Sequence, residues 1–150
     1  GPVPDFPLPR RVVMRWEYED KRRYQVVDAD ATEAVADREL GLWGWAWRTP
    51  QACAWSLPSE SWRLHTIAMW VRTFVLCEGS EATAADKGSL HRFADQIGMT
   101  TAGLAEMGWK ISTDGHSHVG SVKKSKREPT LREQAAASAG WQVIDGDRTA

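Results

Sequence analysis

Apolar residues between Ser59 and Glu78 recur at helical spacing. Six of them fall on one face, and these are Leu64, Ile67, Ala68, Val71, Phe74 and Val75. Further apolar side chains fall elsewhere on the cylinder, and a helix that is apolar on more than one side is buried on more than one side. The pattern predicts a long helix capped by Ser59 and closed by Gly79. We expect a second subunit to cover part of it, with Trp62, Ile67, Met69, Trp70 and Phe74 as interface residues.

The segment Leu90–Lys110 fits the spacing of a helix-turn-helix unit. A first helix over Leu90–Ile97 ends at Gly98, where the chain must reverse and a positive φ is favoured. Thr100 or Thr101 caps the second helix, and apolar residues then return at Leu104 and Met107. Such a unit can place its second helix in the major groove of DNA, with Gln96, Thr100, Thr101 and Lys110 as contacts. The alternative is a structural helical hairpin, because the packing pattern is the same and this second helix lacks arginine.

The N-terminal part alternates between β-prone and charged segments. Val12–Tyr18 and Tyr24–Val27 flank a charged turn, which predicts a small β-hairpin. A basic arm that orders only on binding is the alternative. The prolines before it, at positions 2, 4, 7 and 9, predict an extended, flexible leader. The acidic stretch 28–39 that follows is interpreted as a linker or a short helix.

Glycine and proline interrupt the segment that follows residue 40. Trp43, Trp45 and Trp47 alternate as in a strand, but Gly41, Gly44 and Pro50 argue against any regular element there. A short helix is expected from Pro50 to Trp55 after a Thr49 cap. We therefore divide the chain into an arm and linker over residues 1–39, a helical oligomerisation core with the helix-turn-helix-like unit over 40–112, and a flexible basic tail over 113–150. We expect a short helix in that tail between Pro129 and Gly140.

Tryptophan is the one unusual residue in the composition. It supplies 9 of the 14 aromatic residues among 150 positions. Tryptophan is enriched both in cores and in interfaces. The count therefore fits either a tryptophan-rich core or a surface that contacts another protein.

Charge is unevenly distributed although the net charge is only −1. Residues 40–112 contain six basic and six acidic side chains, whereas residues 28–39 contain five acids and one arginine. The basic residues gather in flanking clusters, which are interpreted either as DNA-backbone contacts or as solvated segments. These clusters are Arg10, Arg11 and Arg15; Lys21, Arg22 and Arg23; and Lys123, Lys124, Lys126 and Arg127.

Motifs for catalysis, metals and membranes are missing from the sequence. There is no phosphate-binding loop and no dinucleotide fingerprint, and His116 and His118 have no cysteine beside them. Cys53 and Cys77 give neither a metal spacing nor a disulfide framework, which is typical of a reduced, intracellular protein. No apolar run reaches the length of a membrane span or a signal peptide. We expect a protein that is not an enzyme, without metal or cofactor.

Several stretches, in this order, resemble the small terminase subunits of tailed double-stranded DNA bacteriophages, especially those of actinobacterial phages. They are the leader GPVPDFPLPRR, the tryptophan-rich WAWRTPQACAW, the helical SESWRLHTIAMWVRTFVL and the closing FADQIGMTTAGLAEMGWKI. Together they cover residues 1–11 and parts of 45–111. The chain departs from that family at Ala105, Glu106 and Met107, where arginines are usual, and the tail beyond Ser112 is not covered.

The resemblance implies a non-catalytic packaging factor in the host cell cytoplasm. Such subunits form homo-oligomeric rings of α-helices, bind the viral double-stranded DNA, and bring it to the large terminase subunit, whose ATPase and nuclease they regulate. Two alternatives remain from the residues themselves. One is a dimeric helix-turn-helix transcription regulator, and the other is a structural scaffold protein without a DNA role.

Overall fold

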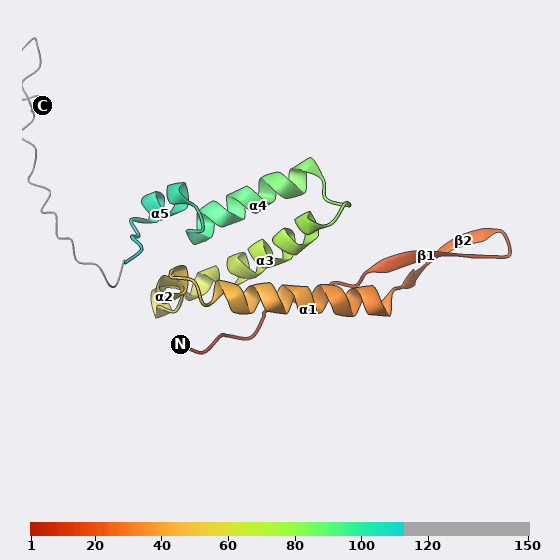
Figure 1. The fold of residues 1–150 in the computed structure, drawn as a ribbon, viewed down its shortest axis with the longest axis horizontal. Helices are drawn as coiled ribbons and strands as arrows, with labels where there is room; N and C mark the ends of the chain where they lie inside the picture. The colour runs from red at the N-terminus through yellow and green to blue at the C-terminus, as the bar shows by residue number, and fades with distance from the viewer. Residues whose placement is uncertain (113–150) are drawn as a thin grey trace, which may run out of the picture. The chain divides into compact units, whose positions relative to one another are not determined.

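The computed structural model describes residues 1–112. This part of the chain is mainly helical and begins with a two-stranded antiparallel hairpin (Figure 1). The elements are β1 (Met14–Glu19), β2 (Arg22–Val27), α1 (Ala29–Ala46), α2 (Gln51–Trp55), the 3₁₀ helix η1 (Pro58–Arg63), α3 (Leu64–Glu78), α4 (Ala84–Ile97) and α5 (Thr101–Met107). The predictions of a mainly helical fold and of the small hairpin are confirmed. None of the helices within residues 1–112 combines the length and apolarity needed to cross a lipid bilayer.

Helix α3 packs against both α1 and α4, which explains its apolar residues on more than one side. Ile67 is 1% exposed and Trp70 5%, so both lie in the core of a single chain. Phe74 is half-buried against the Trp70 ring, with the centroids 5.5 Å apart. Two other expected interface residues, Trp62 and Met69, remain exposed. At Ile67 and Trp70, the expectation that a second subunit covers the helix is therefore wrong, because other helices of the same chain cover both residues.

Helix α1 joins the acidic stretch to the tryptophan-rich stretch in one element of 18 residues. The Asp28 carboxylate caps it by accepting a hydrogen bond from the Ala31 amide at 3.0 Å. The prediction that Gly41 and Gly44 interrupt any regular element here is wrong. Apolar packing of the inner side outweighs the low helix propensity of glycine. The helix also runs across the boundary expected at residue 40.

A buried ion pair explains why an acidic segment is helical and packed. Glu39 is 2% exposed, and its two carboxylate oxygens accept hydrogen bonds from Arg72 on α3 at 3.0 and 2.9 Å. Arg72 also donates to the carbonyl of Pro9 at 2.5 Å. One guanidinium therefore connects α3, α1 and the leader.

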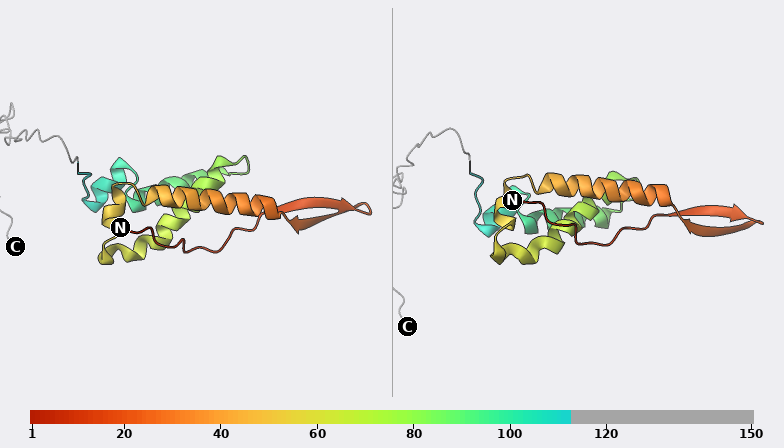
Figure 2. Two further views of the ribbon diagram at one scale, coloured as in Figure 1. Left: turned by 60° about the horizontal axis from the view of Figure 1, so that its bottom comes forward. Right: turned by 90° about the horizontal axis from the view of Figure 1, so that it is seen from below.

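The proline-rich leader is extended as predicted, but it lies against the helices. The Phe6 ring meets the Trp43 ring edge-on, with centroids 5.2 Å apart. The indole nitrogen of Trp43 donates to the Pro4 carbonyl at 2.7 Å. Figure 2 shows this segment running beside α1 before it enters the hairpin. The leader was expected to be flexible, whereas here Pro4 and Phe6 hold it against Trp43 of α1.

Tryptophan forms much of the core of the described chain. The rings of Trp43, Trp47 and Trp55 meet edge-on in sequence, at centroid distances of 5.5 and 5.6 Å. The Trp55 indole nitrogen donates to the Ile97 carbonyl at 2.9 Å, which ties α2 to the end of α4. The interpretation that tryptophan fills the core is therefore correct for Trp43, Trp47 and Trp55, while Trp16, Trp45 and Trp62 remain exposed.

Three helix starts differ from the sequence prediction. Ser59 lies inside η1, and Arg63, which has no side-chain cap, precedes α3. Thr49 does not cap α2, because its hydroxyl donates to the Ala46 carbonyl. Helix α4 begins at Ala84 instead of Leu90, because Thr83 and Asp86 form a reciprocal capping box.

Candidate nucleic-acid interface

The hairpin carries four of the cations predicted to contact DNA. Asp20 and Lys21 connect its strands with φ values of 48° and 60°, as a tight two-residue hairpin turn requires. The register pairs Trp16 with Gln25 and Glu17 with Tyr24. Because successive side chains point to opposite faces, these two pairs mark two different faces of the ribbon.

One side, which we call the aromatic face, is exposed and mostly uncharged. Tyr18 is 74% exposed, and Trp16 is about half exposed. The Arg23 guanidinium lies over the Trp16 ring at 3.5 Å from its centroid, which is cation–π geometry. The aromatic face comprises Met14, Trp16, Tyr18, Arg23, Gln25 and Val27.

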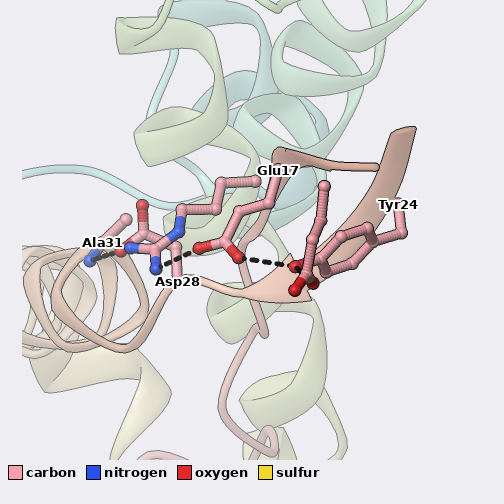
Figure 3. A network of polar contacts seen from close by, with 6 residues as sticks. Glu17, Tyr24, Asp28 and Ala31 are labelled. Atoms are coloured by element: carbon pink, nitrogen blue, oxygen red, sulfur yellow. Dashed lines mark hydrogen bonds and ion pairs between the residues drawn. The ribbon is translucent and has the colours of Figure 1, made fainter. Parts of the chain in front are cut away.

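The opposite side, the polar face, contains a hydrogen-bonded network of charges. Arg15 donates to Glu17 at 2.8 Å, and the Tyr24 phenol donates to Glu19 at 3.1 Å and to Glu17 at 3.2 Å. Figure 3 shows the Tyr24 phenol directed at the Glu17 carboxylate. The bonds to Glu19 and Glu17 raise the pKa of Tyr24, and the bond to Glu17 raises the pKa of Arg15. Glu17 therefore partly neutralises Arg15, whereas Lys21 and Arg22 are exposed near the turn.

The two arginines before the hairpin face acidic groups of the helices. Arg10 pairs with Glu33 on α1 at 2.6 Å, and this hydrogen bond raises the pKa of Arg10. Arg11 is half-buried and acts electrostatically on Asp86 of α4. For either arginine, binding to a phosphate would compete with an attraction inside the chain.

The α4–turn–α5 unit has the local geometry that the sequence predicted. Gly98 is left-handed with a φ of 76°, and Thr100 caps α5 by accepting from the Gly103 amide at 2.9 Å. A Cβ at Gly103 would stand 2.3 Å from the Asp95 carbonyl oxygen, so α5 packs very closely on α4. The two helices are therefore closely joined, as both a DNA-binding helix-turn-helix unit and a structural helical hairpin require.

The predicted DNA contacts of this unit differ in availability. The Thr100 hydroxyl already donates to Asp95 at 2.5 Å, in addition to its cap. Thr101, Gln96 and Lys110 are exposed, and the Gln96 carbonyl accepts a hydrogen bond from Arg63. Helix α5 spans seven residues and contains Glu106 but no Lys or Arg. Its capacity for phosphate contacts is small.

Other candidates lie outside the described residues or find no support in them. Lys123, Lys124, Lys126, Arg127, the His116–His118 pair and the expected C-terminal helix all fall beyond residue 112. Within residues 1–112, His, Cys, Asp and Glu form no group of three that could hold a metal ion.

Sequence reasoning missed two surface features. The aromatic face could have been found from the alternation of Trp16 and Tyr18 with Arg15 and Glu17. The exposed side of α1 could not have been found in this way, because the sequence assigned its residues to two separate segments.

Comparisons with protein-family models, with curated proteins and with solved structures find no match for the chain.

Proposed function

We propose that this chain is a non-catalytic, self-associating protein that binds double-stranded DNA, of the small-terminase type. The observation that carries the proposal is the hairpin, which extends from the helices and presents Arg15, Lys21, Arg22 and Arg23 (Figure 2). A two-stranded β-ribbon fits into the major groove of B-DNA. Lysine and arginine on such a ribbon supply the phosphate contacts that position a protein on DNA.

The charge distribution supports a division of labour between the flanks and the helices. Residues 40–112 are electrically balanced, and α5 lacks cations. Electrostatic affinity then comes mainly from the segment Arg10–Arg23 and from Lys123–Arg127. In a homo-oligomeric ring these modest clusters repeat with every subunit, and their fields add.

The proposed partners follow from the small-terminase type of function. They are viral double-stranded DNA, further copies of the chain in a ring, and the large terminase subunit that supplies the ATPase and nuclease. The place of action is the host cell cytoplasm. Exposed Trp62 and Met69 remain as interface residues for the ring.

A helix-turn-helix transcription regulator is the second candidate. The observation that favours it is the left-handed turn at Gly98 followed by the Thr100 cap, which is the local geometry of such units. In that case Gln96, Thr101 and Lys110 would contact DNA, and the assembly would be a dimer.

Light scattering and DNA titration of the full chain test the proposal together. We expect an assembly larger than a tetramer, DNA affinity that falls steeply with salt, and no ATP hydrolysis without the large subunit. A dimer that binds DNA would support the regulator instead. Absence of salt-dependent DNA binding would overturn both and leave the scaffold protein.

A further inference from the structure

The outer side of α1 is exposed and contains large apolar residues and glycines that contacts within the single chain explain only in part, since the Trp45 ring stacks on Trp70 with centroids 6.5 Å apart. Leu40 is 53% exposed and Trp45 48%, although both are large and apolar. Between them lie Gly41 and Gly44, and no atom lies within 4 Å of the place where a Cβ would stand on either. Glycine inside an exposed helix is destabilising relative to alanine. Within residues 1–112, nothing takes up the space that the missing side chains leave.

These residues follow an order that is the same from either end of the helix. From each end of this segment towards its middle, a charged residue comes first. A large apolar residue stands three positions further in, and a glycine follows directly after it. The two halves are Asp37, Leu40 and Gly41, and, in reverse, Arg48, Trp45 and Gly44. The charged residues at the two ends have opposite signs. At about 100° per residue, Asp37, Gly41 and Gly44 fall within roughly 60° of one another, with Leu40 and Trp45 on opposite flanks. Arg48 lies in the turn that follows the end of α1 at Ala46, and its amide donates to the Trp45 carbonyl at 3.0 Å.

We propose that α1 packs antiparallel against α1 of a second copy of this chain, across a two-fold axis beside the two glycines. This arrangement places Gly41 opposite Gly44 of the second copy and Asp37 opposite its Arg48. The glycines let the two backbones approach closely, and the flanking Leu40 and Trp45 become covered.

Charge complementarity favours a second copy of this chain as the partner, and it favours the antiparallel orientation of the two α1 helices. A parallel pair would place Asp37 opposite Asp37 and Arg48 opposite Arg48, which is repulsive. Within residues 1–112, neither side chain forms a hydrogen bond or ion pair, although Arg10 attracts Asp37 at longer range, so both can pair with a second copy. Arg38 and Glu33 on the same helix are already paired with Glu78 and Arg10.

The two-fold contact is independent of DNA binding, and it constrains the proposed ring. An isologous contact closes at two copies. A cyclic ring therefore requires a second, heterologous contact elsewhere, and the two-fold contact then joins two such rings, so that the total number of copies is even. DNA titration tests the proposed function, whereas the mass of charge-reversed variants tests this contact, so the two can fail separately.

Sedimentation velocity of the full chain tests the pairing by charge reversal. We expect Asp37→Arg and Arg48→Asp each to halve the mass of the assembly, and the double variant to restore it. Asp30→Arg is the matched control, because it reverses an acid on the same side of α1 outside the symmetric segment. An unchanged mass in the single variants, or a double variant that remains dissociated, would overturn the proposal.

A second variant keeps the test valid if charge reversal disturbs folding. Gly41→Leu adds a side chain in space that is open within one chain, and it raises helix propensity. We expect it to melt at a higher temperature than the wild-type chain when both are diluted until dissociated, and to remain dissociated at the concentration where the wild-type chain assembles. A variant that is more stable and still forms the full assembly would contradict the close approach of the two α1 backbones at the glycines.

Discussion

The hairpin and the helices of residues 1–112 use aromatic residues in opposite ways. Trp43, Trp55 and Trp70 are buried among the helices, where their rings fill the core. Trp16 and Tyr18 on the hairpin remain exposed, and the charged neighbour Arg23 covers one of them. Tryptophan content alone therefore does not identify a binding site. The helices supply the stability, and the hairpin presents the side chains that are free to meet a partner.

The hairpin depends on its attachment to α1 for its position. An isolated two-stranded hairpin is marginally stable in water. At its base, the Asp28 amide donates to the Val13 carbonyl at 2.8 Å, and the Val13 amide donates to the Thr32 hydroxyl at 2.9 Å. Asp28 also caps α1. The first turn of α1 therefore anchors the ribbon.

Removing a core tryptophan gives the largest expected effect. We predict that Trp43→Ala lowers the free energy of unfolding by about 4 kcal/mol, because it leaves a cavity and removes the bond to Pro4. Urea denaturation followed by circular dichroism measures it. The control is Leu57→Ala, at a side chain that is 53% exposed and outside the proposed interface, which should cost less than about 1 kcal/mol. Equal losses in the two variants would show that the buried Trp43 ring contributes no more to stability than an exposed side chain.

Breaking the Glu39–Arg72 pair comes next. We predict that Arg72→Met costs about 3 kcal/mol, because the Glu39 carboxylate is left buried without its partner. The double variant with Glu39→Gln should recover part of this loss, since the uncompensated charge is then gone. Denaturant midpoints of the single and double variants provide the measurement. A purely additive double variant would show that the pair is not coupled.

The capping box of α4 should give a smaller, pH-dependent effect. Hydrogen bonds from the Thr83 amide and hydroxyl lower the pKa of Asp86. The stabilisation from a depressed carboxyl pKa is present above the unfolded-state pKa and disappears as pH falls through the folded-state pKa. We predict that Asp86→Asn lowers the thermal midpoint at pH 7 and that the gap to wild type narrows below about pH 4. A gap that is constant with pH would contradict this role.

Removing an aromatic side chain from the hairpin should change stability least. We predict that Trp16→Ala alters the free energy of unfolding of the helices by less than about 0.5 kcal/mol, because the ring is exposed. Urea denaturation followed by helical circular dichroism checks this. A loss comparable to that of Trp43→Ala would mean that the ribbon belongs to the folding core.

The sequence predicted those features that depend on local pattern. A hairpin between Val12 and Val27, a turn at Gly98 and a cap at Thr100 or Thr101 follow from alternation, glycine and short polar residues. The structure has the hairpin over Met14–Val27, the turn at Gly98 and the cap at Thr100. Helix α1 was missed because its helical state depends on contacts distant in sequence. Glu39 is stabilised by Arg72, and Trp43 is covered by the leader. No local pattern reports such contacts.

The candidate site was predictable as a list of cations but not as a surface. The sequence grouped Lys21, Arg22 and Arg23 in one cluster, but it placed Arg15 with Arg10 and Arg11 and not with the hairpin cations. It did not show that Glu17 partly neutralises Arg15, or that Arg23 lies on an aromatic ring. It also assigned Ile67 and Trp70 to an interface, because a periodic pattern cannot tell a second helix of the same chain from a second subunit.

The salt dependence of DNA binding tests most directly whether the hairpin, and not the helices, holds DNA. Lys21→Ala with Arg22→Ala removes two exposed cations near the turn, and Lys87→Ala with Arg92→Ala removes two exposed cations from α4 as the matched control. We predict that the hairpin variant lowers the slope of log affinity against log salt by about 1.8 for each subunit that contacts DNA, while the control leaves it unchanged. An unchanged slope in the hairpin variant, or an equal drop in the control, would contradict the account.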